Sequence, residues 1–219
     1  MAEHSVAEII GEPISLLLKA KSYHLAGSGR EDADVRMLGT GRPFYIQFND
    51  CKEAPPLDED LDKIQNSINS TSSLVNVKKL QTVSDSDIDI IKSSSSEKNK
   101  TYSCLLWVSQ ELSQDSIERI KEYSKKELKI QQKTPVRVLH NRSPLTREKT
   151  IYSMSLEHIK KNFYVLQLTT EAGTYIKEFV HGDLGRTVPN FSSLTNTDSQ
   201  ILELDVLDVD LNFPPNKKN

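Results

Sequence analysis

The stretch SGREDADVRMLGTGRP, residues 28–43, packs two aspartates, a glutamate and three arginines between small and turn-forming residues. It precedes RPFYIQF, residues 42–48, whose aromatic and β-branched side chains are typical of a strand. We therefore expect residues 30–36 to form a connection at the edge of a cleft, where functional side chains often lie. Exposed ion pairs contribute only about 0 to 1 kcal/mol each, so the same composition also fits an ordinary surface turn.

The helical patterns lie in the first and middle parts of the chain. Residues 5–20 have apolar residues at helical spacing, with an expected break at Gly11 and Pro13. Residues 113–128 predict a second helix, which places Ile117, Ile120 and Tyr123 on one stripe.

Strand-like runs separate these helices and follow them. Strands are expected at residues 42–48, 101–108, 134–140, 149–154, 163–170 and 201–213. In the last of these, the apolar positions shift by one residue after Val206, as they do in a bulged strand. Because no βαβ alternation is present, the patterns favour an α+β fold with a largely antiparallel sheet.

Composition predicts one domain, residues 1–219, with an insertion at about residues 50–99. Aromatic residues make up only 6% of the chain, which suggests a single core. Residues 50–97 hold ten acidic residues against five lysines, together with serine runs such as KSSSSEKNK. Charge and low hydrophobicity of this kind are typical of disordered segments, so we expect the insertion to be mostly disordered.

The net charge of −3 hides a segregation of charge along the chain. Residues 119–149 contain ten Lys or Arg and only three Glu, which indicates a local basic face. Such a run is usually a solvated surface, and it is also what contact with nucleic acid requires.

Cysteine and histidine spacing gives no indication of a metal site or a disulfide framework. The longest apolar run, ISLLL, is too short to span a bilayer, and the first ten residues lack the basic start of a signal peptide. We therefore expect no membrane association and an intracellular location, nuclear and/or cytoplasmic.

Four segments that occur in order closely resemble the catalytic domain of the archaeal and eukaryotic tRNA pseudouridine synthases that modify uridines 54 and 55 of the TΨC arm. The resemblance leaves out the acidic insertion, and the family's accessory N-terminal RNA-binding domain is expected to be absent. GRED is also similar to GRTD of the TruA class, and GTYIKEFVHGDLG to the corresponding TruB motif. The segments are HLAGSGREDADVRMLGTGRPF, KTYSCLLWVS, TPVRVLHNRSPLTREKTIY and TEAGTYIKEFVHGDLGRTVPNFSSL.

The resemblance implies a pseudouridine synthase fold with a central RNA-binding cleft, and it implies roles for particular residues. Asp32, directly after Gly29, Arg30 and Glu31, matches the catalytic aspartate, whereas Asp34 does not. Tyr102 matches the tyrosine that stacks on the target base, and Lys177 matches the basic partner of the aspartate. Arginines within the motifs are expected to contact RNA phosphates or loops: Arg30, Arg36, Arg42, Arg137, Arg142 and Arg186.

The implied reaction isomerises uridine to pseudouridine at position 54 and/or 55 of tRNA. It contains no redox step, so no cofactor is expected. The carboxylate of Asp32 is suited to act as a nucleophile at the anomeric carbon or as a base toward a glycal intermediate, and the residues leave both open. Two other classes of protein remain as alternatives: a non-catalytic RNA-binding protein with the same fold, and an interaction module whose acidic insertion binds a basic partner.

Overall fold

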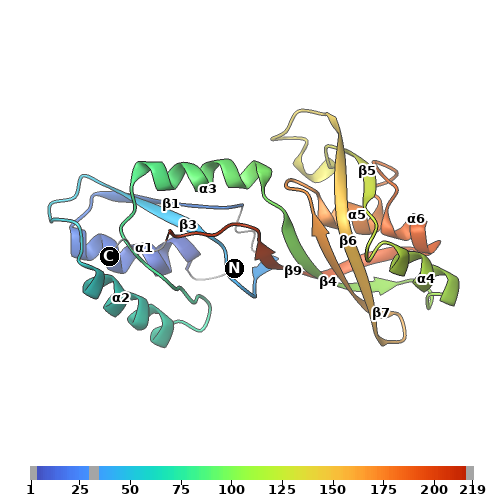
Figure 1. Cartoon of the computed structure of the whole chain (residues 1–219), viewed down its shortest axis with the longest axis horizontal. Helices are drawn as coiled ribbons and strands as arrows, with labels where there is room; N and C mark the ends of the chain where they lie inside the picture. Colours follow the sequence, from blue (N-terminus) through green and yellow to red (C-terminus); the bar gives the residue numbers. More distant parts are fainter. Residues whose placement is uncertain (1–3, 30–34, 216–219) are drawn as a thin grey trace. The chain divides into compact units, whose positions relative to one another are not determined.

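The computed structural model describes residues 4–29 and 35–215, and the chain forms two compact units (Figure 1). Unit 1 comprises residues 1–31, 43–95 and 211–219, and unit 2 comprises residues 32–42 and 96–210. Each unit has its own cluster of buried apolar side chains, which differs from the single domain that the sequence predicted. The buried residues of the apolar cluster in unit 1 are all aliphatic, so the low aromatic content did not reveal this second core.

Unit 1 combines a two-stranded antiparallel sheet with helices. Strands β1 and β3 pair from Ser22 opposite Asn49 to Gly27 opposite Phe44. Helix α1 supplies one side of the core through Ile10, Ile14 and Leu18, which are spaced along one helical stripe. The elements are α1 (Val6–Leu18), β1 (Ser22–Gly27), β3 (Phe44–Asn49), α2 (Asp58–Thr71) and most of α3 (Asp85–Glu97).

Helix α1 passes through Gly11 and Pro13 without interruption, so the expected break is wrong. Its start is fixed by a capping box in which Ser5 Oγ accepts from the Glu8 amide and Glu8 accepts from the Ser5 amide. The ring of Tyr23 occupies the space that a side chain on Gly11 would need. Tertiary packing of the apolar stripe therefore outweighs the local cost of a glycine and a proline.

The acidic, serine-rich segment contains the two helices α2 and α3, and it contributes to the core of unit 1, which corrects the expectation of disorder. Leu61 and Ile68 of α2 are buried. Between α2 and α3 the chain has no strand, but the side-chain amide of Asn69 donates to Val77 O at 2.8 Å and accepts from Val77 N at 2.7 Å. A few buried aliphatic residues and this amide order a segment whose average composition resembles disorder.

Unit 2 is built on a seven-stranded sheet with the order β2-β9-β4-β7-β6-β5-β8. All its pairings are antiparallel except that of β2 with β9, so the largely antiparallel α+β architecture is confirmed. The strands are β2 (Val35–Met37), β4 (Lys100–Val108), β5 (Leu128–Lys133), β6 (Thr146–Lys160), β7 (Phe163–Thr170), β8 (Thr187–Val188) and β9 (Ser199–Val209). The helices are α4 (Gln114–Glu122), η1 (Val136–Val138), α5 (Ile176–His181) and α6 (Phe191–Thr195).

Strand β9 has the bulge that its sequence predicts. Tyr102 of β4 pairs with Val206, whereas Thr101 pairs with Asp208, so Leu207 is the extra residue. The shift keeps both Val206 and Val209 buried. The change in the apolar period after Val206 therefore marks a real irregularity of the sheet.

The segment between α4 and β6 differs from the expectation. Ile120 is buried on the predicted stripe, but α4 ends at Glu122 and the strand β5 follows at Leu128–Lys133. Residues 134–140 contain the short helix η1 and no strand. The strand β5 was not predicted because it ends in polar residues. Its buried Gln132 is held by hydrogen bonds and not by apolar packing.

The helices among residues 4–29 and 35–215 are too short or too polar to serve as membrane spans.

Candidate active site

The catalytic aspartate that the motif predicts, Asp32, lies outside the described residues, as do Arg30 and Asp34. The chain is described again from Val35, where β2 begins. Val35 pairs with Leu204 of β9, and Leu204 pairs in turn with Cys104 of β4. Residues 35–37 are thus paired with β9, the strand that borders β4.

Arg36 is engaged in ion pairs with β9. Its Nε donates to Asp205 Oδ1 at 2.6 Å, and its Nη2 donates to Asp205 Oδ2 at 2.8 Å and to Glu203 Oε2 at 2.7 Å. These hydrogen bonds raise the pKa of the Arg36 guanidinium. Arg36 therefore holds β2 against β9, and its contact with RNA stays a prediction.

Tyr102 lies on β4, which pairs with β7 on one side and with β9 on the other. It pairs with Leu168 of β7 on one side and with Val206 of β9 on the other. Its half-buried side chain packs against the core of unit 2. Burial raises the pKa of the Tyr102 hydroxyl to about 12, so the ring is neutral at physiological pH. A neutral aromatic side chain on a rigid strand is suited to stacking on a base.

A buried cation that sequence reasoning missed lies two residues before Tyr102. Lys100 is 7% exposed, and its Nζ donates to Lys98 O at 3.2 Å. Burial, assisted by the nearby positive charge of Arg42, lowers the pKa of Lys100. The available signal was the alternation of a strand: Lys100, Tyr102 and Cys104 are at positions that share one face of the sheet.

Lys177 is half-buried near the start of the short helix α5. This helix packs against β9, the strand that also pairs with β2. Lys177 therefore lies on a helix that contacts β9. The strand β2, which begins three residues after Asp32, pairs with the same strand.

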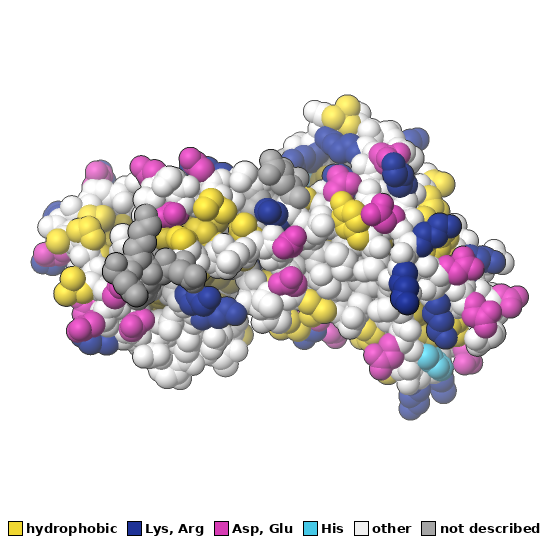
Figure 2. Space-filling view, in the orientation of Figure 1, with side chains coloured by type: hydrophobic (Ala, Val, Ile, Leu, Met, Phe, Trp, Pro, Cys, Tyr) yellow, Lys and Arg dark blue, Asp and Glu magenta, His cyan; other side chains and the backbone are white. Residues whose placement is uncertain are grey.

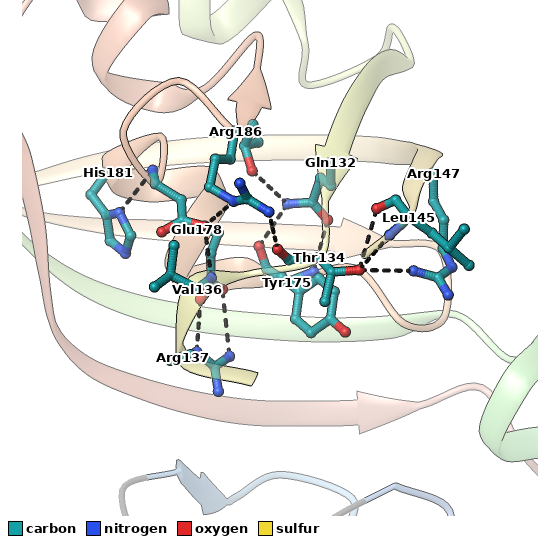
Figure 3. A network of polar contacts seen from close by, with 12 residues as sticks. Gln132, Thr134, Val136, Arg137, Leu145, Arg147, Tyr175, Glu178, His181 and Arg186 are labelled. Atoms are coloured by element: carbon teal, nitrogen blue, oxygen red, sulfur yellow. Dashed lines mark hydrogen bonds and ion pairs between the residues drawn. The ribbon is translucent and has the colours of Figure 1, made fainter. Parts of the chain in front are cut away.

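The remaining arginines occupy different surroundings. Arg142 is exposed in the connection between η1 and β6. Arg186 donates from Nη2 to Thr134 O at 2.6 Å, and its Nε lies 3.5 Å from Asp183 Oδ2 (Figure 3). Arg137 forms an ion pair with Glu178 at 2.7 Å. Of these three, only Arg142 is exposed and forms no salt bridge within the described part of the chain.

Lys and Arg side chains are spread over the visible face of unit 2 among acidic ones (Figure 2). Part of the basic segment at residues 119–149 is engaged locally: Lys129 with Glu148 and Lys149 with Glu171. Among residues 4–29 and 35–215, no group of three or more His, Cys, Asp or Glu is arranged to hold a metal ion.

Comparison with known proteins gives the relationship of the whole chain. The family model described as "Pus10, C-terminal" matches residues 1–210. The chain belongs to this Pus10 family. The matched range includes residues 50–99, so the acidic helical segment is part of the family's C-terminal region and the resemblance is wider than the motifs indicated.

Curated members of the family share this region at substantial identity. The human "tRNA pseudouridine synthase Pus10" is 43% identical over 213 residues, which are 97% of this chain and 40% of that protein. The protein of the same name from the archaeon Korarchaeum cryptofilum is 35% identical over 206 residues, 94% of this chain and 54% of that protein. The chain thus spans about half or less of the length of these relatives.

Among solved structures, a chain of the "Crystal Structure of a Cbf5-Nop10-Gar1 Complex" has a TM-score of 0.55 and 15% sequence identity. The likeness covers 95% of this chain and 46% of that one. At this identity it concerns the fold alone, and it confirms the expected pseudouridine synthase fold class.

Proposed function

We propose that this chain carries the catalytic domain of a tRNA pseudouridine synthase and that it isomerises uridine in the TΨC arm, at position 54 and/or 55. The observation that carries the proposal is the match of residues 1–210 to the Pus10 C-terminal family. The relatives named tRNA pseudouridine synthase support the substrate class.

In the proposed reaction, Asp32 acts on the target nucleoside, as nucleophile or as base. The N1–C1′ bond breaks, the uracil rotates, and a C5–C1′ bond forms; C5 loses a proton and N1 gains one. No electrons enter or leave, so the proposed chemistry needs no cofactor. The protein has to retain the detached base, and it has to stabilise the charge of the carboxylate.

Tyr102 and Lys177 are suited to these two tasks. Taking a base out of its stack costs a few kcal/mol, and stacking on an aromatic ring returns about 1 to 3 kcal/mol. Tyr102 offers a neutral ring on a strand held by pairing on both sides. We propose that Lys177 pairs with Asp32 and that Arg30, Arg142 and Arg186 contribute to RNA binding. An intracellular location, nuclear and/or cytoplasmic, would fit this substrate.

The direct test is to incubate the chain with a tRNA transcript that contains no modified bases. Pseudouridine is then mapped by carbodiimide treatment and primer extension. We expect a stop one nucleotide 3′ of position 54 or 55 with the parent chain and with Asp34→Asn, and none with Asp32→Asn. Binding of the transcript without any product would favour the non-catalytic RNA-binding protein.

A further inference from the structure

The feature that carries a further inference is a buried carboxylate beside Lys177. Glu178 follows Lys177 on α5 and is 2% exposed. A charge in such a place is costly unless it is paired and hydrogen-bonded. The partner comes from η1, which β6 and β7 separate from α5 along the sequence. Arg137 Nε donates to Glu178 Oε1 at 2.7 Å and Arg137 Nη2 lies 3.4 Å from Oε2 (Figure 3).

Helix α5 depends on contacts of this kind for its position. It has six residues, and its N-cap, Tyr175, makes no side-chain capping hydrogen bond. A helix this short is unstable by itself, so its orientation is set by neighbouring segments. Gln132 of β5 supplies one such contact: its side-chain amide donates to Tyr175 O and accepts from Tyr175 N, both at 2.9 Å.

Arg137 contacts α5 on both sides of Lys177. Besides the ion pair with Glu178, its guanidinium carbon lies 6.0 Å from the centre of the Tyr175 ring. The same segment is also fastened beyond the end of the helix, where the Val136 amide lies 3.4 Å from Asp183 Oδ2. The connection from β5 to β6 therefore contacts α5 near its start and the chain just past its end.

We propose that Arg137 and Glu178 form a positioning pair, which fixes the first turn of α5 and thereby the side chain of Lys177 relative to the connection between β5 and β6. The inference rests on the proposed function, because it assigns Lys177 to the reaction. Stability alone gives little reason for such a pair, since apolar residues of similar volume often replace a buried ion pair without loss. Arg137 is half exposed, with 51% of its side chain accessible, so the pair also links a surface connection to the site.

The pair predicts a loss of rate that is separate from a loss of binding. Glu178→Gln and Arg137→Gln should each lower the single-turnover rate at saturating tRNA by about tenfold or more, because small misplacements of a reacting group are costly. For Glu178→Gln the dissociation constant of tRNA should stay within about threefold of the parent. The double variant should be no slower than the slower single variant, since both changes remove one interaction.

A second measurement reports on position without catalysis. Amide hydrogen exchange of residues 176–181 should become about tenfold faster in Glu178→Gln, while exchange in β4 and β7 stays as in the parent. The matched control is the Lys19–Glu53 pair, which has the same 2.7 Å separation but is exposed and lies in unit 1. Lys19→Gln should change neither the rate nor the exchange of α5.

The outcomes separate the inference from the proposed function. A parent chain that makes no pseudouridine would overturn the proposed function, and the exchange experiment would still decide whether the pair holds α5. An active parent with parent-like rates and exchange in both single variants would overturn the positioning pair. Additive losses in the double variant would likewise show that the two residues act separately.

Discussion

Arg36 and Asp205 join the edge strand β2 to its neighbour β9 through two hydrogen bonds, of 2.6 Å from Nε and 2.8 Å from Nη2. Asp205 is 9% exposed, so the contact lies at the boundary of the core and solvent. This pair holds β2, which begins three residues after Asp32 in the sequence, against β9.

Replacing Arg36 by Met removes both hydrogen bonds to Asp205, so this carboxylate loses the two N–H donors of the guanidinium. We expect the turnover rate to fall by about tenfold or more, because β2, which begins three residues after Asp32, is then no longer held to β9 by this pair. Arg36→Lys should give an intermediate rate, since it keeps the charge but not the two-point geometry. Single-turnover rates at saturating tRNA measure this; a change in tRNA affinity with an unchanged rate would instead support contact between Arg36 and RNA.

Tyr102 should act through its ring and not through its hydroxyl. Its pKa of about 12 keeps the hydroxyl protonated across the working range, so Tyr102→Phe should retain the parent's rate and pH profile. Tyr102→Ala should lose about 1 to 3 kcal/mol of stacking, seen as a lower kcat/KM. If Phe were as damaging as Ala, with thermal unfolding unchanged, the hydroxyl itself would take part.

Lys100 gives a stability prediction with a definite sign. Its pKa is lowered in the folded chain, chiefly by burial and then by Arg42, so the unfolded chain binds this proton more tightly. Stability then rises with pH between the folded pKa and the ordinary value near 10.5, and the cost of the buried charge is fully present below the folded pKa. Lys100→Met should therefore stabilise the chain most near pH 7 and progressively less toward pH 10.

Urea unfolding at several pH values checks this prediction for Lys100. Lys129 is the control of opposite sign, because Glu148 raises the pKa of this exposed lysine. Lys129→Gln should slightly destabilise the chain, by an amount that stays constant between pH 7 and 10, because a raised pKa contributes stability that is fully present below the ordinary value of 10.5. A parallel dependence for Lys100→Met and Lys129→Gln would contradict the buried state of Lys100.

Ile68 tests whether the acidic segment belongs to a core. It is 3% exposed on α2, so Ile68→Ala should lower the free energy of unfolding of unit 1 by about 2 to 5 kcal/mol. Leu74, which is 74% exposed, provides the control, and Leu74→Ala should stay within about 0.5 kcal/mol of the parent. Hydrogen exchange of α1 reports on unit 1 separately; equal protection in both variants would mean that α2 does not stabilise this unit.

The sheet of unit 2 could be predicted in part because apolar and polar residues alternate along many of its strands. The period change in β9 located its bulge at Leu207. The helices at residues 58–97 could not be predicted from composition, because a few aliphatic residues and the amide of Asn69 order a mainly polar segment. Strand β5 was missed for a related reason: Gln132 is buried by hydrogen bonds to α5, which no local pattern reveals.

The candidate site shows the same division. Tyr102 and Lys177 could be selected because each lies within a long motif, and motifs are local in sequence. The partners of Arg36 and Arg137 could not be identified, since the residues they bind are 169 and 41 positions away along the chain. Their charges suggested RNA contact, whereas the fold pairs them with carboxylates of β9 and α5.

Lys177 is proposed to keep the Asp32 carboxylate ionised, and this gives the sharpest pH prediction. Burial alone raises a carboxyl pKa, by up to about 3 to 5 units in full burial. A cation at about 4 Å, in surroundings of effective dielectric constant near 20, contributes on the order of 4 kcal/mol, or about three pKa units in the opposite direction. The two effects are similar in size, so the basic partner decides whether the carboxylate is charged near neutral pH.

Removing that partner should therefore affect chemistry more than binding. Lys177→Met should slow turnover much more than it weakens tRNA binding, and it should move the acid limb of the pH–rate profile to higher pH, because the unpaired carboxyl then takes up a proton more readily. Lys177→Arg keeps the positive charge and should retain substantial activity with the acid limb in place. Single-turnover rates measured from pH 5 to 9 on parent, Met and Arg chains distinguish these cases. A Met variant with the parent's rate and acid limb would remove Lys177 from the site, and an Arg variant as slow as Met would show that the shape of the lysine, and not its charge, is what the site requires.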